Sequence, residues 1–284
     1  MLYIDENSKV VVCGITGKQG TLHTKLMKEY GTNIVAGVTP GKGGMQNEGI
    51  PVYNTVKEAV KNTGANVSII FVPASFAADS IIESSDAGIE LCVCITEGIP
   101  VLDMIKVKSY LRDKKMVLLG PNCPGLIVPG KCKVGIMPND IHTEGKIGVI
   151  SRSGTLTYEV VKLLKDAGYG ESAVIGIGGD PIHGINFIDA LEAFNNDDNT
   201  ECVVLIGEIG GNDEEKAADW IEKNMNKKVV AYIGGKSAPK GKRMGHAGAI
   251  VSGNSGTAKS KTEYLKTKNI PVANTLSEIL QCLK

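Results

Sequence analysis

One histidine lies in a segment rich in glycine and basic residues, and this is the part of the sequence best suited to chemistry. Residues 235–250 read GKSAPKGKRMGHAGAI, with the histidine at position 246. The basic residues that could attract an anion there are Lys236, Lys240, Lys242 and Arg243. Glycine lets a backbone approach a ligand closely, and histidine can be a nucleophile near neutral pH. The segment therefore suits a histidine that accepts and passes on a phosphoryl group, although a histidine in an ordinary solvated loop fits the same composition.

A carboxylate and a helix start follow predicted strands in the same half of the chain. Glu208 comes directly after an apolar run, where it could orient the imidazole of His246 and fix its tautomer. A solvated charge at the end of a strand is the alternative interpretation. Upstream, Ser153 precedes a helical pattern and is suited to cap it. The amides of Gly154 and Thr155 would then be free to bind an anion.

A glycine turn near the N-terminus predicts a second phosphate site. Residues 14–20 read GITGKQG between an apolar run and a helical pattern, so amides and the helix dipole would face an anion. The spacing is GxxGxxG, whereas NAD enzymes have GxGxxG. NAD enzymes also need an acidic residue after the second strand, to hold the ribose. This chain has Lys42 there, which would attract the phosphate of NADP or the 3′-phospho-ADP of coenzyme A.

Three further turns leave predicted strands in the first half of the chain. They read FVPA at residues 71–74, ITEG at residues 95–98 and GPNCPG at residues 120–125. Each alone fits ordinary turn chemistry. Open α/β sheets bind ligands at the carboxyl ends of their strands, so three such turns at one edge favour a binding site.

Short β-branched runs alternate with helical patterns along the whole chain, which predicts doubly wound parallel sheets covered by helices. In the first half we expect strands at Lys9–Cys13, Ile34–Val38, Val67–Val72, Leu91–Ile95 and Met116–Leu119, and helices at Thr21–Tyr30, Phe76–Ala87 and Val101–Lys114. In the second half we expect strands at Lys146–Ile150, Ser172–Ile177, Cys202–Ile206 and Val229–Ile233, and helices at Thr155–Ala167, Asn186–Asn195, Glu214–Asn224 and Gly256–Lys268.

The alternation stops between residues 120 and 145, which hold four prolines and several glycines but no convincing helical pattern. Such a stretch is typical of a join between domains. We therefore predict a first domain at residues 1–122, a connecting segment at 123–145 and a second domain at 146–284.

Composition narrows the class of protein. The 284 residues include 31 acidic and 31 basic side chains, so no overall charge favours nucleic acid or a membrane surface as a partner. Seven dispersed cysteines fit a reducing compartment, and no apolar run is long enough to span a bilayer, so we expect a soluble cytoplasmic protein. No spacing of His, Cys or acidic residues suggests a metal bound by this chain. Two of the three arginines, Arg152 and Arg243, fall in the candidate loops, and arginine suits bidentate contacts with carboxylate or phosphate.

Taken together, these motifs resemble the α subunit of succinyl-CoA synthetase (succinate–CoA ligase), and the resemblance covers essentially the whole chain. The matching stretches in the first half are residues 16–20, 38–44, 95–100 and 120–125. Those in the second half are residues 151–159, 176–181, 207–211 and 238–250. Their number and order make the match far more specific than any one motif.

The resemblance implies roles for particular residues. Coenzyme A would bind a Rossmann-like first domain, through Thr16, Gly17, Lys18, Gln19, Lys42, Ile95, Thr96 and Glu97. A flavodoxin-like ligase domain would follow, in which His246 carries the phosphoryl group, with Glu208 as its partner. Tyr158 would lie beside the acid substrate, on a helix that begins at the phosphate-binding residues Ser153, Gly154 and Thr155.

The resemblance also implies a partner. An ATP-grasp β subunit would bind Mg²⁺ and ATP or GTP, in an αβ or α₂β₂ assembly. The predicted reaction joins succinate to coenzyme A at the expense of a nucleoside triphosphate, through succinyl phosphate and a phosphohistidine. The alternatives are a related ligase acting on malate, acetate or another small acid, an NADP-dependent oxidoreductase, and a CoA-responsive binding protein without catalysis.

Overall fold

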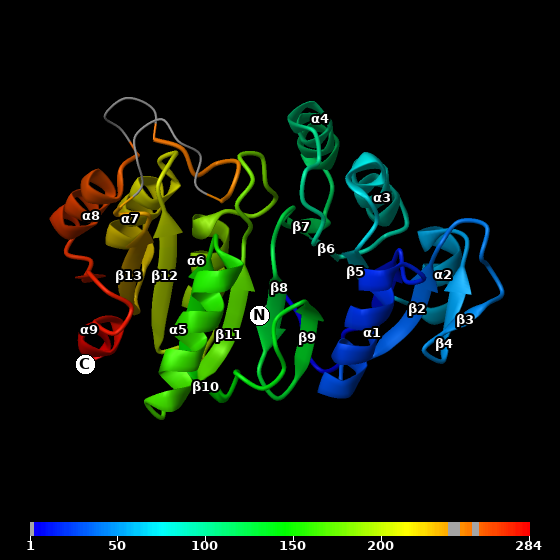
Figure 1. Ribbon diagram of the computed structural model, residues 1–284, viewed down its shortest axis with the longest axis horizontal. Coiled ribbons are helices and arrows are strands. Elements are labelled where there is room, and N and C mark those ends of the chain that lie inside the picture. The colour runs from blue at the N-terminus through cyan, green and yellow to red at the C-terminus, as the bar shows by residue number, and fades with distance from the viewer. Residues whose placement is uncertain (1–2, 238–244, 252–255) are drawn as a thin grey trace.

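The computed structural model of the chain describes residues 3–237, 245–251 and 256–284. Two seven-stranded sheets stand side by side, the first built from the N-terminal half and the second mostly from the C-terminal half (Figure 1). Each sheet has helices packed against it, as the alternating pattern predicts. Among the described residues, no helix combines the length and apolar character needed to cross a membrane.

The first sheet has the strand order of a dinucleotide-binding fold. Its strands are β1 (Val10–Cys13), β2 (Ile34–Val38), β3 (Gln46–Asn47), β4 (Ile50–Tyr53), β5 (Val67–Ile70), β6 (Leu91–Cys94) and β7 (Val117–Leu119), arranged β3-β4-β2-β1-β5-β6-β7. All neighbours pair in parallel except β3 and β4. The chain reverses its direction of winding between β1 and β5, which is where such sheets bind ligands.

Alternation along the strands explains how helices cover both faces of this sheet. Its helices are α1 (Lys18–Tyr30), α2 (Val56–Thr63), α3 (Ala74–Asp86) and α4 (Val101–Leu111). Val10 and Val12 belong to the same cluster as Met27 of α1. Val11 and Cys13 point to the other face and belong to a cluster with residues of α2, α3 and α4.

The second sheet has flavodoxin-like order with an added hairpin, so the fold class expected from the sequence is confirmed. Its strands are β8 (Gly125–Val128), β9 (Cys132–Gly135), β10 (Glu144–Ser151), β11 (Glu171–Gly176), β12 (Cys202–Glu208), β13 (Lys228–Gly234) and β14 (Val272–Ala273), arranged β14-β13-β12-β10-β11-β8-β9. Its helices are α5 (Gly154–Asp166), α6 (Phe187–Asn195), α7 (Asp213–Asn224), α8 (Ala258–Thr267) and α9 (Ile279–Leu283). The winding reverses between β10 and β12, which makes that edge a second place for a ligand.

The segment between the predicted domains contains structure of its own. Residues 123–145 contribute β8 and β9, which form an antiparallel hairpin, and the start of β10. Through β8 the hairpin pairs antiparallel with β11 and so extends the second sheet. A proline and a glycine at positions 129 and 130 lie at its turn, which explains why this stretch carries the composition of a linker.

Candidate functional site

A cavity of about 610 Å³ opens at the carboxyl ends of β1, β2 and β5, where the winding of the first sheet reverses. Thr16 and Gly17 of the first glycine turn line it on one side. Pro40 and the exposed ring of Phe76 add apolar surface. A cavity with a glycine turn and an apolar wall suits a nucleotide, whose phosphates bind amides and whose base packs on apolar side chains.

Lys42 lies next to the glycine turn, as the sequence predicts. Its ammonium donates to the hydroxyl of Thr16 at 3.2 Å, and that hydroxyl donates to Thr39 at 3.2 Å. Lys42 itself is exposed. The structure thus brings together one exposed positive charge, two hydroxyls and the cavity, which is an arrangement suited to a phosphate on a ribose.

The glycine turn needs its glycines. A β-carbon at Gly20 would lie 2.2 Å from the carbonyl oxygen of Gly14, so the helix can start this close to β1 only without a side chain there. Helix α1 begins at Lys18, and no side chain caps it at Gly17. The amides of its first turn are therefore left for a ligand or for water.

A second cavity of about 270 Å³ lies next to the first, shares Phe71 and Val72 with it, and is also lined by Ile136, which follows β9. Gln19, Ile95 and Thr96 line it, together with residues that include His23 and Phe71, whose rings stack with centroids 5.5 Å apart. The structure therefore brings these predicted ligand-binding residues to one channel. Three others, Lys18, Lys42 and Glu97, are exposed and line neither cavity.

His246 and Glu208 form a hydrogen-bonded pair at the carboxyl edge of the second sheet. Glu208 ends β12, and His246 lies in the segment after β13, with Nδ1 at 2.8 Å from Oε2 of Glu208. A carboxylate only accepts, so Nδ1 carries the proton, and in the neutral imidazole Nε2 keeps its lone pair. The bond to Glu208 raises the pKa of His246 above its usual 6.5, against the opposing effect of burial. Such an imidazole can attack through Nε2 while Glu208 stabilises the charge that develops on the ring.

The turn after β11 packs directly against this imidazole. A β-carbon at Gly179 would lie 2.2 Å from Cγ of His246, so only glycine lets the ring lie there. Asp180 follows, buried, and adds a negative charge that favours the protonated imidazole. Its side chain accepts a hydrogen bond from Asn122 at 2.9 Å.

Asn122 connects the two candidate sites. Its backbone N–H donates to the carbonyl of Thr96 at 3.0 Å, and its own carbonyl accepts from Gly179 at 3.3 Å. Thr96 lines the second cavity, while Gly179 packs against the imidazole of His246. One residue therefore links the channel in the first half to the histidine in the second half.

Three further charged residues lie close to Glu208 on the side away from His246. Glu214 and Lys261 were not predicted as site residues, and Arg152 was noted only because it lies in a candidate loop. Arg152 Nε lies 3.4 Å from Oε1 of Glu208, and its Nη1 lies 3.7 Å from Glu214. Glu214 accepts the backbone N–H of Glu208 at 3.0 Å and contacts the ammonium of Lys261. All these side chains are buried. Glu214 and Lys261 lie inside predicted helices, and the spacing along the chain gives no signal that they meet.

Helix α5 begins beside the same edge. Ser153 caps it by accepting from the amide of Leu156 at 3.3 Å, as the sequence predicts. The hydroxyl of Tyr158 lies 3.9 Å from where a β-carbon of Gly154 would be, so the tyrosine reaches back to the helix start. Burial raises the pKa of Tyr158, which keeps it a neutral hydroxyl at physiological pH.

Cys123 of the GPNCPG turn has no sign of reactivity in this structure. Its thiol donates to the carbonyl of Cys94 at 3.3 Å, and burial raises its pKa to about 12. A thiol of this kind packs as a small apolar side chain and is a poor nucleophile.

The basic residues of the histidine segment are not gathered around His246 in what the structure describes. Lys240, Lys242 and Arg243 lie outside the described residues. Lys236 is exposed, and its ammonium donates to the carbonyl of Asn274 at 2.6 Å.

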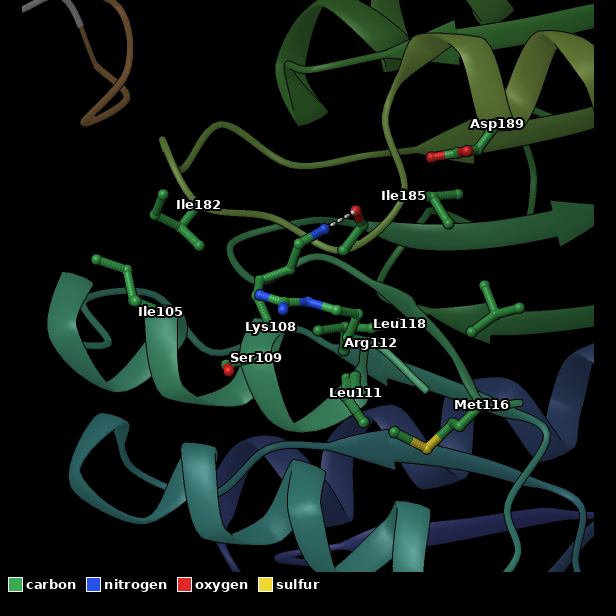
Figure 2. Close-up of a pocket in the computed structure, with 12 residues that line it drawn as sticks. Ile105, Lys108, Ser109, Leu111, Arg112, Met116, Leu118, Ile182, Ile185 and Asp189 are labelled. Atoms are coloured by element: carbon green, nitrogen blue, oxygen red, sulfur yellow. Dashed lines mark hydrogen bonds between the residues drawn. The ribbon is translucent and has the colours of Figure 1, made fainter. Parts of the chain in front are cut away.

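A separate cavity of about 690 Å³ lies where helix α4 faces residues 182–189 (Figure 2). Lys108 reaches across from α4 and donates to the carbonyl of Gly184 at 3.0 Å. None of the predicted site residues lines this cavity.

Comparisons with known proteins match two families and several close relatives. The CoA binding domain family matches residues 5–98, and the CoA-ligase family matches residues 150–270. A protein of Staphylococcus epidermidis, named succinate–CoA ligase [ADP-forming] subunit alpha, is 60% identical over 278 residues, which is 98% of this chain and 92% of that protein. A protein of Staphylococcus aureus with the same name gives the same identity and coverage.

Solved structures share the fold at lower identity. ATP citrate lyase of Methanothrix soehngenii, in complex with citrate and coenzyme A, matches 99% of this chain with a TM-score of 0.90 and 23% identity. The present chain spans 50% of that lyase chain. A dinucleotide-forming acetyl-coenzyme A synthetase of Ca. Korarchaeum cryptofilum matches 96% of this chain and 59% of its own, with a TM-score of 0.76 and 18% identity. These two likenesses establish the architecture alone.

Proposed function

Since this chain belongs to the family of succinate–CoA ligase α subunits, we propose that it forms succinyl-CoA together with a β subunit, with His246 as the carrier of the phosphoryl group. The observation that carries the proposal is the 2.8 Å bond from Nδ1 of His246 to Glu208. It leaves Nε2 as the only ring nitrogen with a lone pair for phosphorus. The relatives are named as ADP-forming, so we infer ATP as the phosphoryl donor.

The residues around His246 support each step of this chemistry. Nε2 forms a bond to phosphorus as the bond from phosphorus to ADP breaks, and Glu208 stabilises the positive charge on the ring. The phosphoryl group then passes to a carboxylate oxygen of succinate, which restores the imidazole and gives succinyl phosphate. The sulfur of the CoA thiol attacks the acyl carbon, the bond from that carbon to the phosphate oxygen breaks, and the thiol proton leaves with the phosphate. The capped start of α5, at Ser153, Gly154 and Thr155, offers amides to the phosphoryl oxygens.

Coenzyme A fits the two adjacent cavities of the first half, which share Phe71 and Val72 in their linings. We assign its nucleotide to the cavity at Thr16 and Gly17, with Lys42 toward the 3′-phosphate. Its pantetheine arm would follow the channel lined by Gln19, Ile95 and Thr96. Asn122 lies at the end of that path, beside the turn under His246, so the arm leads toward the proposed phosphoryl carrier. We also assign Lys18 and Glu97 to this site from their positions in the turns at residues 14–20 and 95–98.

The acid and the nucleotide complete the proposed complex. Tyr158 lies at the start of α5, close enough to contact a small carboxylate held there. An ATP-grasp β subunit would bind Mg²⁺ and the nucleotide, in an αβ or α₂β₂ complex. All seven cysteines are free thiols, which supports a reducing compartment, and we propose the cytoplasm. We retain the domain division at residues 1–122, 123–145 and 146–284 as a proposal about units that fold around each site.

Labelling of the histidine tests this function directly. The tagged chain would be purified with the β subunit from its own host, incubated with γ-labelled ATP and Mg²⁺, and mapped for acid-labile phosphate by peptide mass spectrometry. We expect label on His246 that succinate plus coenzyme A discharges and malate or acetate does not. The His246→Asn variant should take up no label but should bind coenzyme A normally. Label elsewhere, or none in an active complex, would contradict the assignment of His246.

A further inference from the structure

Four charged side chains form a buried row that starts at His246 and leads away from it. Glu208 comes first, then Arg152, then Glu214, and Lys261 closes the row at its far end. The side chains of Glu214 and Lys261 are 0% exposed, and those of Arg152 and Glu208 are 5% and 9% exposed. The row thus holds two positive and two negative charges, with the Arg152 guanidinium between the two carboxylates.

Geometry shows that Arg152 is placed by charge more than by directional bonds. Its Nε and Nη1 lie 3.4 and 3.7 Å from the two carboxylates, and neither atom has a hydrogen-bond partner among the described residues. Oε1 of Glu208 also lacks a partner there. A guanidinium held in this way can move toward whichever carboxylate has less positive charge nearby.

Lys261 determines which of the two carboxylates, Glu208 or Glu214, has less positive charge nearby. Its ammonium contacts Glu214 and donates to the carbonyl of Gly210 at 2.6 Å, and the carboxylate of Glu215 lies 4.0 Å away. With Lys261 in place, Glu214 already has a cation. Without it, Glu208 and Glu214 would share one guanidinium, and a fully buried carboxylate without a partner is costly.

We propose that Lys261 is a positioning residue for the phosphoryl-carrying histidine: by neutralising Glu214 it leaves Arg152 beside Glu208, and so holds Glu208 against His246. Glu214 also holds the backbone of Glu208 in place, because it accepts the backbone N–H of Glu208 at 3.0 Å. The inference rests on the proposed function of His246. It adds a role for a residue on α8 whose polar contacts are with Gly210, Glu214 and Glu215 and not with the histidine itself.

A set of variants in the complex with the β subunit tests this role. The rate of His246 labelling by γ-labelled ATP would be measured for Lys261→Met, for Lys261→Met combined with Glu214→Gln, and for Lys261→Arg. We expect Lys261→Met to slow labelling by about tenfold or more, the scale of effect expected when a buried charge loses its partner. The double variant should recover to within about threefold, because Glu214→Gln removes the unpaired charge but keeps the acceptor for the amide of Glu208. Lys261→Arg keeps the charge and should also label.

Lys259→Met is the matched control, since Lys259 lies on the same helix with its side chain 85% exposed. It should label at the normal rate, and the Kd for coenzyme A should stay unchanged in every variant. A folded double variant as slow as Lys261→Met, or a normal rate in Lys261→Met, would overturn the inference. If Lys261→Met does not fold, a folded double variant that fails to label overturns it equally. Absence of label on the unmodified complex would instead count against the proposed function.

Discussion

Replacing Gly179 by alanine tests whether the His246–Glu208 bond depends on the turn beneath the ring. A β-carbon at this position would lie 2.2 Å from Cγ and 2.6 Å from Nδ1 of the imidazole, far inside contact distance. The backbone at Gly179 does not have a positive φ, so alanine strains the site only through this contact. The ring must therefore move, and the 2.8 Å bond to Glu208 must lengthen or break.

The size of the effect follows from the bond that is lost. A hydrogen bond to a charged group contributes about 1.5–3 kcal/mol, and roughly 1.4 kcal/mol corresponds to a factor of ten in rate. We therefore expect Gly179→Ala to slow phosphorylation of His246 by about 10- to 150-fold, on the same arithmetic. The assay is rapid-quench labelling of the complex with γ-labelled ATP, at saturating nucleotide.

Gly234→Ala is the matched control for this change. It adds the same methyl group at the end of β13, the strand that pairs with β12, where the nearest atom is the flexible end of Leu156, 3.0 Å away. Gly234 is buried, but the end of the Leu156 side chain can shift to make room, so we expect the rate to stay within about twofold of normal. A normal rate in Gly179→Ala with an unchanged melting temperature would refute the argument, because it would show that the ring needs neither this position nor this bond.

Two further predictions concern the pKa of His246 and the binding of coenzyme A near Lys42. The bond from Glu208 raises the pKa of His246, and the neutral imidazole is the nucleophile, so phosphorylation should rise with pH through that raised pKa. Glu208→Gln removes the cause, so the acid limb of the pH–rate profile should move to lower pH while the maximum rate falls; an unmoved limb would mean that the bond does not set the pKa. In the first half, Lys42→Glu should weaken coenzyme A by about tenfold or more but dephospho-coenzyme A by less than about threefold, because only the former carries the 3′-phosphate. Calorimetry of both ligands decides this, and equal losses would remove Lys42 from the 3′-phosphate site.

Most of the fold could be predicted from periodicity because its strands are buried on both faces. The predicted strand at Ile34–Val38 matches β2 residue for residue, and the other predicted strands and helices differ from the structure by a few residues at their ends. Helix α2 was missed although the sequence carries a start signal. Thr55 and Glu58 have the spacing of a helix cap, and the Thr55 hydroxyl accepts from the amide of Glu58 at 3.1 Å.

The site was predictable where a local motif carries it and not where distant residues meet. Glycine turns mark the strand ends at which Thr16 and Gly179 lie, because backbone packed near the first and the His246 ring packed against the second leave no room for a side chain. By contrast, Lys261 meets a glutamate 47 residues earlier. Nothing in an amphipathic helix distinguishes a lysine that turns inward to a buried partner from one that stays in water.

The hairpin of β8 and β9 contacts both halves of the molecule and so holds them together. It pairs with the second sheet, yet Lys133 at its core exchanges hydrogen bonds with Thr32 of the first half, at 2.7 and 3.1 Å. The amide of Asn139 likewise donates to the carbonyl of Leu26 on α1. A gene fragment that ends before the hairpin would leave α1 bare, and one that starts after it would expose the edge of β11. The two halves are therefore poor candidates for expression as separate proteins, and fragments meant to recombine should overlap through residues 123–145.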